Sequence, residues 1–172
     1  SLRGAISIAG VGDFIEFDPV VQAPAVITIT SPLPPINAGA VTIQGPLSDP
    51  PQVIIDGSGA TAGSDGLRLE SDNNVLLGLW IRNFPGDGVV IEEAANKRLG
   101  QQCSPLGLLH ETGNGGWGLR ISGEAADGNK IGNQRIGTDG SSALGNAAGG
   151  LLIEAGADSN QIGDNCNATV WV

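Results

Sequence analysis

Charged side chains recur at matching places in four short segments, and these residues are the ones best suited to chemistry. In each segment a glycine precedes a triplet that begins and ends with an aliphatic residue, and Glu70, Glu92 and Glu154 follow three of the triplets. Arg68 and Arg120 are the middle residues of two triplets. Each stands two residues before the position that follows its triplet, and therefore lies on the same side of an extended chain as that position. Carboxylates repeated in this way could bind a divalent cation, because hard cations prefer several oxygen ligands.

Whether these carboxylates meet depends on how the four segments are arranged. Their glycines stand at 66, 88, 118 and 150, so successive segments start 22, 30 and 32 residues apart. Neighbouring strands lie about 4.8 Å apart, which would bring Glu70 and Glu92 close enough to repel each other or to share Ca²⁺. The alternative is a solvated face whose Arg and Glu residues form weak surface ion pairs.

Each glycine-led triplet is followed by an asparagine-led segment, and then a third apolar segment closes the turn. The asparagine-led segments begin at Asn74, Asn96, Asn129 and Asn160, and the third segments cover 79–82, 106–110 and 134–138. Three short strands per turn of about 22 residues, separated by Gly, Asn or Asp corners, are typical of a parallel β-solenoid. We therefore expect an all-β fold in which residues 11–172 form about seven coils with loop insertions.

Alternation along each triplet places its first and third residues on one side of the strand and its middle residue on the other. The first and third residues should stack inward as aliphatic ladders: Leu67, Leu69, Val89, Ile91, Leu119, Ile121, Leu151 and Ile153. The middle residues are mixed, as an outer face should be: Arg68, Val90, Arg120 and Leu152.

The first ten residues differ from the rest and predict a short helix. Ser1 can cap its N-terminus, and Leu2, Ala5 and Ile6 would form its buried side. A helix over 1–10 would cover one end of the solenoid, where unpaired strand edges need protection.

Several segments together resemble the secreted and surface right-handed parallel β-helix repeat proteins of the pectate-lyase-like superfold. The matching segments are "SLRGAI", "GDFIEFDP", "ITITSPLPPI", "VTIQG", "VIIDGSG" and "IGNQRIGTD". The family usually opens with a Cys before Ser-Leu-Arg, which this chain lacks, so we expect the sequence to be a segment of a longer protein. The resemblance covers nearly the whole chain and implies a single right-handed parallel β-helix. It leaves the function open, because such coils serve adhesins, scaffolds and polysaccharide-active enzymes.

The resemblance also suggests roles for the charged face. β-Helix pectate lyases place Ca²⁺-binding carboxylates and an Arg base on such a face, so a lyase reading implies Arg68 and Arg120 as base candidates and Glu70 and Glu92 as Ca²⁺ ligands. The Asn-Thr-Asp, Gly-His-Gly and Arg-Ile-Lys signatures of the related hydrolases are missing. Acidic residues that a hydrolase could use sit in Asp-Gly and Ser-Asp contexts typical of turns: Asp56, Asp65, Asp72 and Asp87.

Two single residues need separate interpretation. His110 is the one histidine of the chain and has no partner motif, so we expect a loop or surface position. Trp80 should alternate outward in Leu79-Trp80-Ile81, where it could stack on a sugar or lie under a loop.

The two cysteines, Cys103 and Cys166, each lie three residues after a strand-ending glycine. In that register they are two rungs apart, about 9–10 Å, whereas a disulfide needs Cα atoms within about 7 Å. We therefore expect no disulfide.

The final segment, 168–172, is short, apolar and lacks a charged residue or Pro. It is expected to continue into further chain or to pair with another protomer.

Composition narrows the function classes. The 172 residues suffice for one domain, and 28 Gly with three Phe and three Trp indicate a core of aliphatic side chains. A net charge of −10 without a basic cluster argues against nucleic-acid binding, and no segment has the roughly 20 apolar residues of a membrane span. We expect an extracellular or cell-surface, non-catalytic module that contacts other protomers, surface polymers or a carbohydrate. The alternative is a lyase or hydrolase acting on an acidic polysaccharide, with Ca²⁺ as the one cofactor considered.

Overall fold

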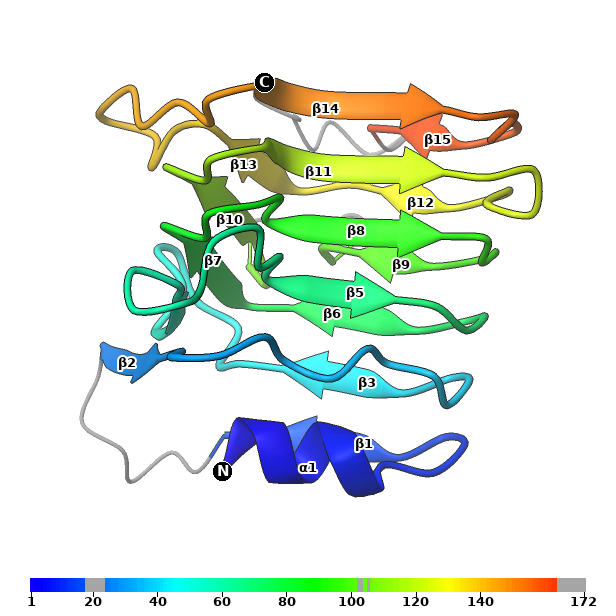
Figure 1. Cartoon of the computed structure of the whole chain (residues 1–172), viewed down its shortest axis with the longest axis horizontal. Coiled ribbons are helices and arrows are strands. Elements are labelled where there is room, and N and C mark those ends of the chain that lie inside the picture. Colours follow the sequence, from blue (N-terminus) through cyan, green and yellow to red (C-terminus); the bar gives the residue numbers. More distant parts are fainter. Residues whose placement is uncertain (18–23, 102–103, 105, 164–172) are drawn as a thin grey trace.

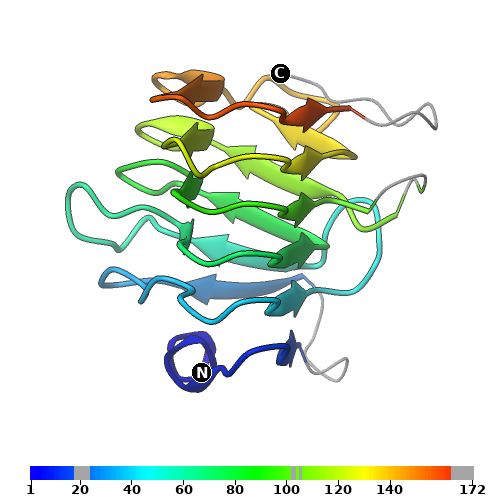
Figure 2. The same cartoon turned by 90° about the vertical axis from the view of Figure 1, so that its right-hand side faces the viewer.

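The chain winds into a parallel β-solenoid of about five turns, with three sheets running along its length and one helix at an end (Figures 1 and 2). This computed structural model describes residues 1–17, 24–101, 104 and 106–163. Every pairing between named strands is parallel, which confirms the solenoid expected from the repeats. Cys103, Cys166 and the segment 168–172 lie outside the described residues.

The asparagine-led segments form the longest sheet, here called sheet A. Its strands, in spatial order, are β1 (Phe14–Glu16), β3 (Thr42–Gln44), β6 (Val75–Leu77), β9 (Arg98–Leu99), β12 (Lys130–Ile131) and β15 (Gln161–Ile162). The third segments form sheet B, with β2 (Ala25–Thr28), β4 (Val53–Asp56), β7 (Leu79–Arg82), β10 (Leu109–Thr112) and β13 (Gln134–Ile136).

The glycine-led triplets form sheet C in the register that their spacing predicts. Its strands are β5 (Leu67–Leu69), β8 (Val89–Glu92), β11 (Trp117–Ser122) and β14 (Gly149–Glu154). Ile121 pairs with Ile91 on one side and with Ile153 on the other. The described residues make about five turns, against the seven coils expected for 11–172. Insertions such as 137–148 lengthen individual turns without adding strands to the three sheets.

The aliphatic ladders form the core. The six inward residues from Leu67 to Ile121 are buried in one continuous cluster, as the alternation predicts. Ile153 keeps its place in the ladder but is 39% exposed, because β14 is the last strand of sheet C among the described residues and pairs there with β11 alone. The burial of an inward residue therefore depends on the position of its strand in the stack as well as on the sequence pattern.

The predicted N-terminal helix is α1 (Leu2–Ile8), which lies beside β1 at one end of the stack (Figure 1). The Ser1 side chain accepts a hydrogen bond from the Gly4 N–H at 3.2 Å, and Leu2 and Ile6 are buried. Ala5, expected to be buried with them, is only half-buried.

Buried asparagines explain why the sequence repeats. The Asn129 Oδ1 accepts from the Lys97 N–H at 2.8 Å, one turn earlier. The Asn129 backbone N–H and Nδ2 both donate to the Asn160 Oδ1 at 2.9 Å, one turn later. A second ladder links the Phe84 N–H to Asn114 and Asn114 to Asn146. Each corner asparagine thus satisfies backbone donors that would otherwise be buried without a partner.

The close approach of neighbouring turns also requires a glycine at position 100. Gly100 has φ +78°, and a Cβ there would lie 1.8 Å from the backbone oxygen of Gly132 in the next turn. A side chain at this position would therefore both strain the backbone and collide with the neighbouring turn.

Candidate functional site

Sheet C brings the charged residues singled out by the sequence onto one outer face. Arg68 contacts three carboxylates: Asp65 at 2.8 Å, Glu70 at 3.1 Å, and Glu92 from the next turn. Partial burial by itself lowers the pKa of the Arg68 guanidinium, but its hydrogen bonds to Asp65 and Glu70 outweigh burial and raise that pKa. Arg68 is therefore a permanent cation that links two turns.

Arg120 forms a second, separate group on the same face. Its Nε donates to the Asp87 Oδ2 at 2.7 Å, and its Nη1 lies 3.5 Å from Glu154. Ser122 takes the place of a glutamate beside Glu92 and Glu154 in the register. Partial burial lowers the pKa of Arg120, but its contacts with Asp87 and Glu154 together outweigh burial and raise that pKa. Both arginines are thus compensated by carboxylates of this chain.

Val90 departs from the expected outer face. It points outward between Arg68 and Arg120 in the register, yet it is fully buried. The two arginines are its register neighbours on the adjacent strands, and long charged side chains cover apolar surface with their stems while their head groups reach water.

The carboxylates proposed as Ca²⁺ ligands, Glu70 and Glu92, both contact the Arg68 guanidinium. Among the described residues, no group of three or more His, Cys, Asp or Glu side chains is arranged to hold a metal ion. In this arrangement Arg68 supplies the positive charge that a shared cation would supply.

Removal of Arg68 should reveal whether a cation can take its place between the carboxylates. Arg68→Ala leaves Asp65, Glu70 and Glu92 facing one another, so we expect the free energy of unfolding to fall by about 1–2 kcal/mol. Ca²⁺ should restore part of that loss in the variant and add little to the unsubstituted protein. Urea unfolding with and without Ca²⁺ measures both effects, with Arg98→Ala as a control that removes an exposed cation. Equal stabilisation of both proteins by Ca²⁺ would contradict the expectation.

The aspartates predicted to form turns do bind backbone N–H groups. Asp56 accepts from Ser58 in its own turn at 2.9 Å. Three others reach into the next turn of the solenoid: Asp65 to Asp87, Asp72 to Ala95 and Asp87 to Trp117. The sequence context indicated corner roles, and the structure adds that these side chains tie successive turns together.

Sheet B carries a second group of polar residues, which the sequence did not bring together. Trp80, His110 and Arg135 occupy one outward column on β7, β10 and β13. The prediction that His110 lies in a loop or at the surface is wrong, because it is in strand β10 and is 0% exposed. Its neighbours on both adjacent strands have large side chains that cover it.

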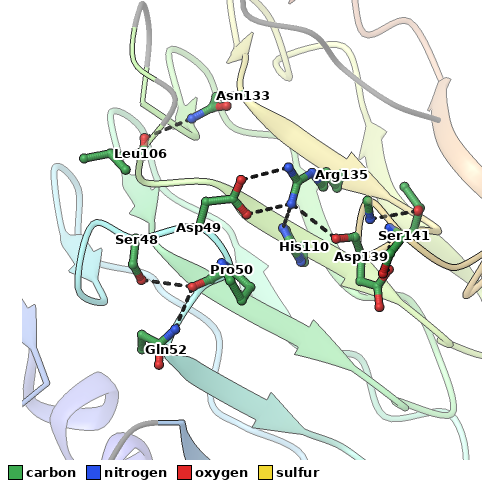
Figure 3. Close-up of polar contacts among 12 residues, drawn as sticks. Ser48, Asp49, Pro50, Gln52, Leu106, His110, Asn133, Arg135, Asp139 and Ser141 are labelled. Atoms are coloured by element: carbon green, nitrogen blue, oxygen red, sulfur yellow. Dashed lines mark hydrogen bonds and ion pairs between the residues drawn. The ribbon is translucent and has the colours of Figure 1, made fainter.

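Arg135 joins this column to a distant loop (Figure 3). Its two terminal nitrogens donate to the two oxygens of Asp49 at 2.6 and 2.8 Å, across 86 residues of sequence. Asp49 belongs to the loop between β3 and β4, drawn in cyan in Figure 2, which extends along the stack beside later turns. Arg135 Nη1 also donates to the Asp139 backbone oxygen at 3.2 Å. A bidentate pair of this kind has a defined geometry.

The His110 ring lies below this pair, with its Nε2 3.5 Å from Arg135 Nη1. Burial lowers the pKa of His110, Arg135 lowers it further, and Asp49 and Asp139 partly oppose them, which gives a pKa of about 4. The imidazole is therefore neutral at neutral pH. Because Arg135 can only donate, a hydrogen bond between the two makes Nε2 the accepting nitrogen, whereas Nδ1 has no hydrogen-bond partner among the described residues.

Trp80 lies half-buried on the outer face, in agreement with the expected outward direction. Its Nε1 donates to the Thr112 Oγ1 at 2.8 Å, and its ring meets His110 edge-to-face with centroids 5.3 Å apart. The Arg82 guanidinium carbon lies 5.4 Å from the indole centroid, within range of a cation–π contact. These contacts fix the indole in one orientation.

Inside the solenoid, Glu111 breaks the aliphatic ladder of sheet B. It pairs in register with Ile81 and Ile136, is 0% exposed, and neither of its oxygens has a hydrogen-bond partner among the described residues. Burial raises the pKa of its carboxyl well above the ordinary value. The alternation that makes Leu109 inward also makes Glu111 inward, a signal missed when the segment was ended at His110.

No protein-family model matches the chain, and no curated protein or solved structure matches it either. In the described part of the chain, no helix has the length and apolar character needed to cross a membrane.

Proposed function

We propose that this chain is a non-catalytic β-helix module of a secreted or cell-surface protein, where it acts as a rigid structural or adhesive element. The observation that carries the proposal is the internal compensation of four outward arginines on sheets B and C. Arg68, Arg82, Arg120 and Arg135 each bind a carboxylate of the same chain. Such pairs tie turns and loops to one another, which suits a scaffold.

The ionisable groups of the two faces also fit general acid–base catalysis poorly. A catalytic acid or base works best when its pKa lies near the working pH. The pKa values of Arg68 and Arg120 are raised, whereas that of His110 is lowered to about 4 and its ring is enclosed. Glu111 has a raised pKa but lies inside the core.

The first turn offers a surface for contact with another protein or another protomer. Three large apolar side chains there are mostly exposed: Ile8, Val11 and Phe14. Exposed apolar residues that gather at one end of a repeat structure favour association. Secretion and membership of the pectate-lyase-like superfold rest on the sequence resemblance and are part of this proposal.

The alternative is a polysaccharide lyase, because Arg68, Glu70, Glu92 and Arg120 do lie on one face of sheet C. We expect no unsaturated products and no new reducing ends from polygalacturonate, alginate or xylan, with or without Ca²⁺. Absorbance of unsaturated products and a reducing-sugar assay measure both. Turnover that is lost in Arg120→Ala or Glu92→Ala, while the variant remains folded, would favour the lyase instead.

A further inference from the structure

The outer face of sheet B is hollowed on two sides of Trp80. One hollow, of about 420 Å³, is lined by Trp80, by Arg135 of β13 and by residues of two loops: Asp49, Pro50, Asp139, Gly140 and Ser141. The other, of about 270 Å³, is lined by Trp80, Arg82, Asn83, Thr112, Gly113 and Leu144, among others. Trp80 is common to both, so one indole separates two adjoining hollows on the same face.

The aromatic platform is preorganised. Thr112 holds the indole Nε1, His110 packs against the ring, and Arg82 lies over it. An aromatic side chain that is already fixed loses little conformational freedom when a ligand stacks on it. The flanking loops are also held in place, because Arg135 binds both Asp49 and the Asp139 backbone oxygen.

Hydrogen-bond donors and acceptors lie on both sides of the platform. On one side the Asp49 side chain is 36% exposed and the Arg135 side chain is 21% exposed, so both reach solvent while they bind each other. On the other side Arg82 binds Asp56, and its side chain is 30% exposed. A sugar hydroxyl both donates and accepts, and therefore suits an Arg–Asp pair whose remaining groups are accessible.

The charges on this face exclude an anionic ligand. Each arginine of the two hollows is already neutralised by an aspartate, and the chain as a whole carries a net charge of −10. A polymer of acidic sugars would meet net repulsion there. A neutral ligand carries no such cost.

We propose that these two hollows form a binding site for a neutral oligosaccharide, with one sugar ring stacked on Trp80 and its neighbours beside Asp49–Arg135 and Arg82. This inference rests on the proposed adhesive function and specifies its ligand class. The indole is half-buried, so part of it stays accessible beside Arg82 and His110. An apolar sugar face stacks on this accessible part, and the ring hydroxyls exchange hydrogen bonds with the two ion pairs.

The test uses the full chain labelled with 5-fluorotryptophan, which gives resolvable ¹⁹F signals for its three tryptophans. The Trp80 signal is assigned by its loss in Trp80→Phe. Hexasaccharides of cellulose, xylan, mannan, laminarin and chitin are titrated to millimolar concentration, with hexagalacturonate as the acidic comparator. We expect at least one neutral hexasaccharide to shift the Trp80 signal in a saturable way and hexagalacturonate to leave it unchanged.

Two variants test the contacts, with one matched control. Trp80→Ala should weaken binding of the responding sugar, measured by calorimetry, by about tenfold or more. Asp49→Asn keeps the size of the side chain but removes its charge, and should weaken binding several-fold. Trp117→Phe alters a half-buried tryptophan on sheet C and should leave affinity unchanged. Thermal unfolding confirms that each variant is folded.

The inference is overturned if no neutral hexasaccharide shifts Trp80, if folded Trp80→Ala binds as tightly as the unsubstituted chain, or if hexagalacturonate binds more tightly. These outcomes are separate from failure of the proposed function, which would be seen as product formation in the activity assays. A chain that binds neutral sugar and also cleaves a polysaccharide would retain the site and lose the non-catalytic assignment.

Discussion

Replacement of Glu111 by leucine should stabilise the protein at neutral pH and remove a pH dependence of folding that this residue causes. Glu111 stands in an inward ladder between Ile81 and Ile136, and its oxygens lack hydrogen-bond partners among the described residues. Burial is the cause of its raised pKa. No charged side chain opposes burial, since His110 and Arg135 project from the opposite face of the sheet.

The sign of the effect follows from proton uptake. In the unfolded chain the Glu111 carboxyl has its ordinary pKa of about 4.5, whereas in the folded protein it remains protonated to much higher pH. Between these two values the folded state binds one proton more than the unfolded state, so stability falls as pH rises. The slope is up to about 1.4 kcal/mol per pH unit between the two pKa values.

Urea unfolding followed by circular dichroism from pH 5 to 8 measures this slope. Glu111→Leu should abolish it and raise stability at pH 7 by a few kcal/mol, of the order expected when an unpaired buried carboxyl is replaced by an aliphatic side chain. Glu111→Gln should abolish the slope with less gain, because the buried amide stays unsatisfied. Glu16→Gln, at an exposed strand position, should leave the slope intact. A slope that persists in both Glu111 variants would show that another group titrates.

The second large effect is expected at Asn129. Asn129→Ala removes the acceptor of the Lys97 N–H and one donor to the Asn160 Oδ1, in a position that is 0% exposed. Each buried group left without a partner costs about 1–3 kcal/mol. We therefore expect the free energy of unfolding to fall by about 2–4 kcal/mol.

Lys130→Ala is the matched control, because Lys130 is the next residue in the chain but is exposed on β12. It should change stability by less than about 0.5 kcal/mol. The comparison is made by urea unfolding at one pH. A loss at Asn129 no larger than the loss at Lys130 would show that water replaces the asparagine ladder and that the repeat of corner asparagines has another cause.

Much of sheet C could be predicted because its information is local. Each triplet carries its own alternation and its leading glycine, and three of the four are followed by a glutamate, so Leu69, Ile91 and Ile121 align once the turns are assumed to stack. The same reasoning placed Arg68 near Glu70 and Glu92. It did not reveal that the arginine takes the position between the carboxylates, since that depends on side-chain conformations across two turns.

Sheet B contains two buried residues, Glu111 and His110, whose burial was not predicted from the sequence. Extending the alternation two residues past Leu109 would have marked Glu111 as inward, and its charge in an aliphatic ladder would have stood out. The burial of His110 needed more, because it depends on Trp80 and Arg135 from the two adjacent turns. A lone histidine in a sequence carries no information about which side chains cover it.

The sequence by itself determined the parallel solenoid, its helical cap, the inward ladders and the corner roles of asparagine and aspartate. These features depend on spacing along one chain and on the fixed distance between stacked strands. Only the tertiary structure decided the surface around Trp80, where Asp49 meets Arg135 across 86 residues. That contact depends on the path of a loop that runs beside several turns, and no period in the sequence specifies such a path, because a loop of this kind pairs with no strand.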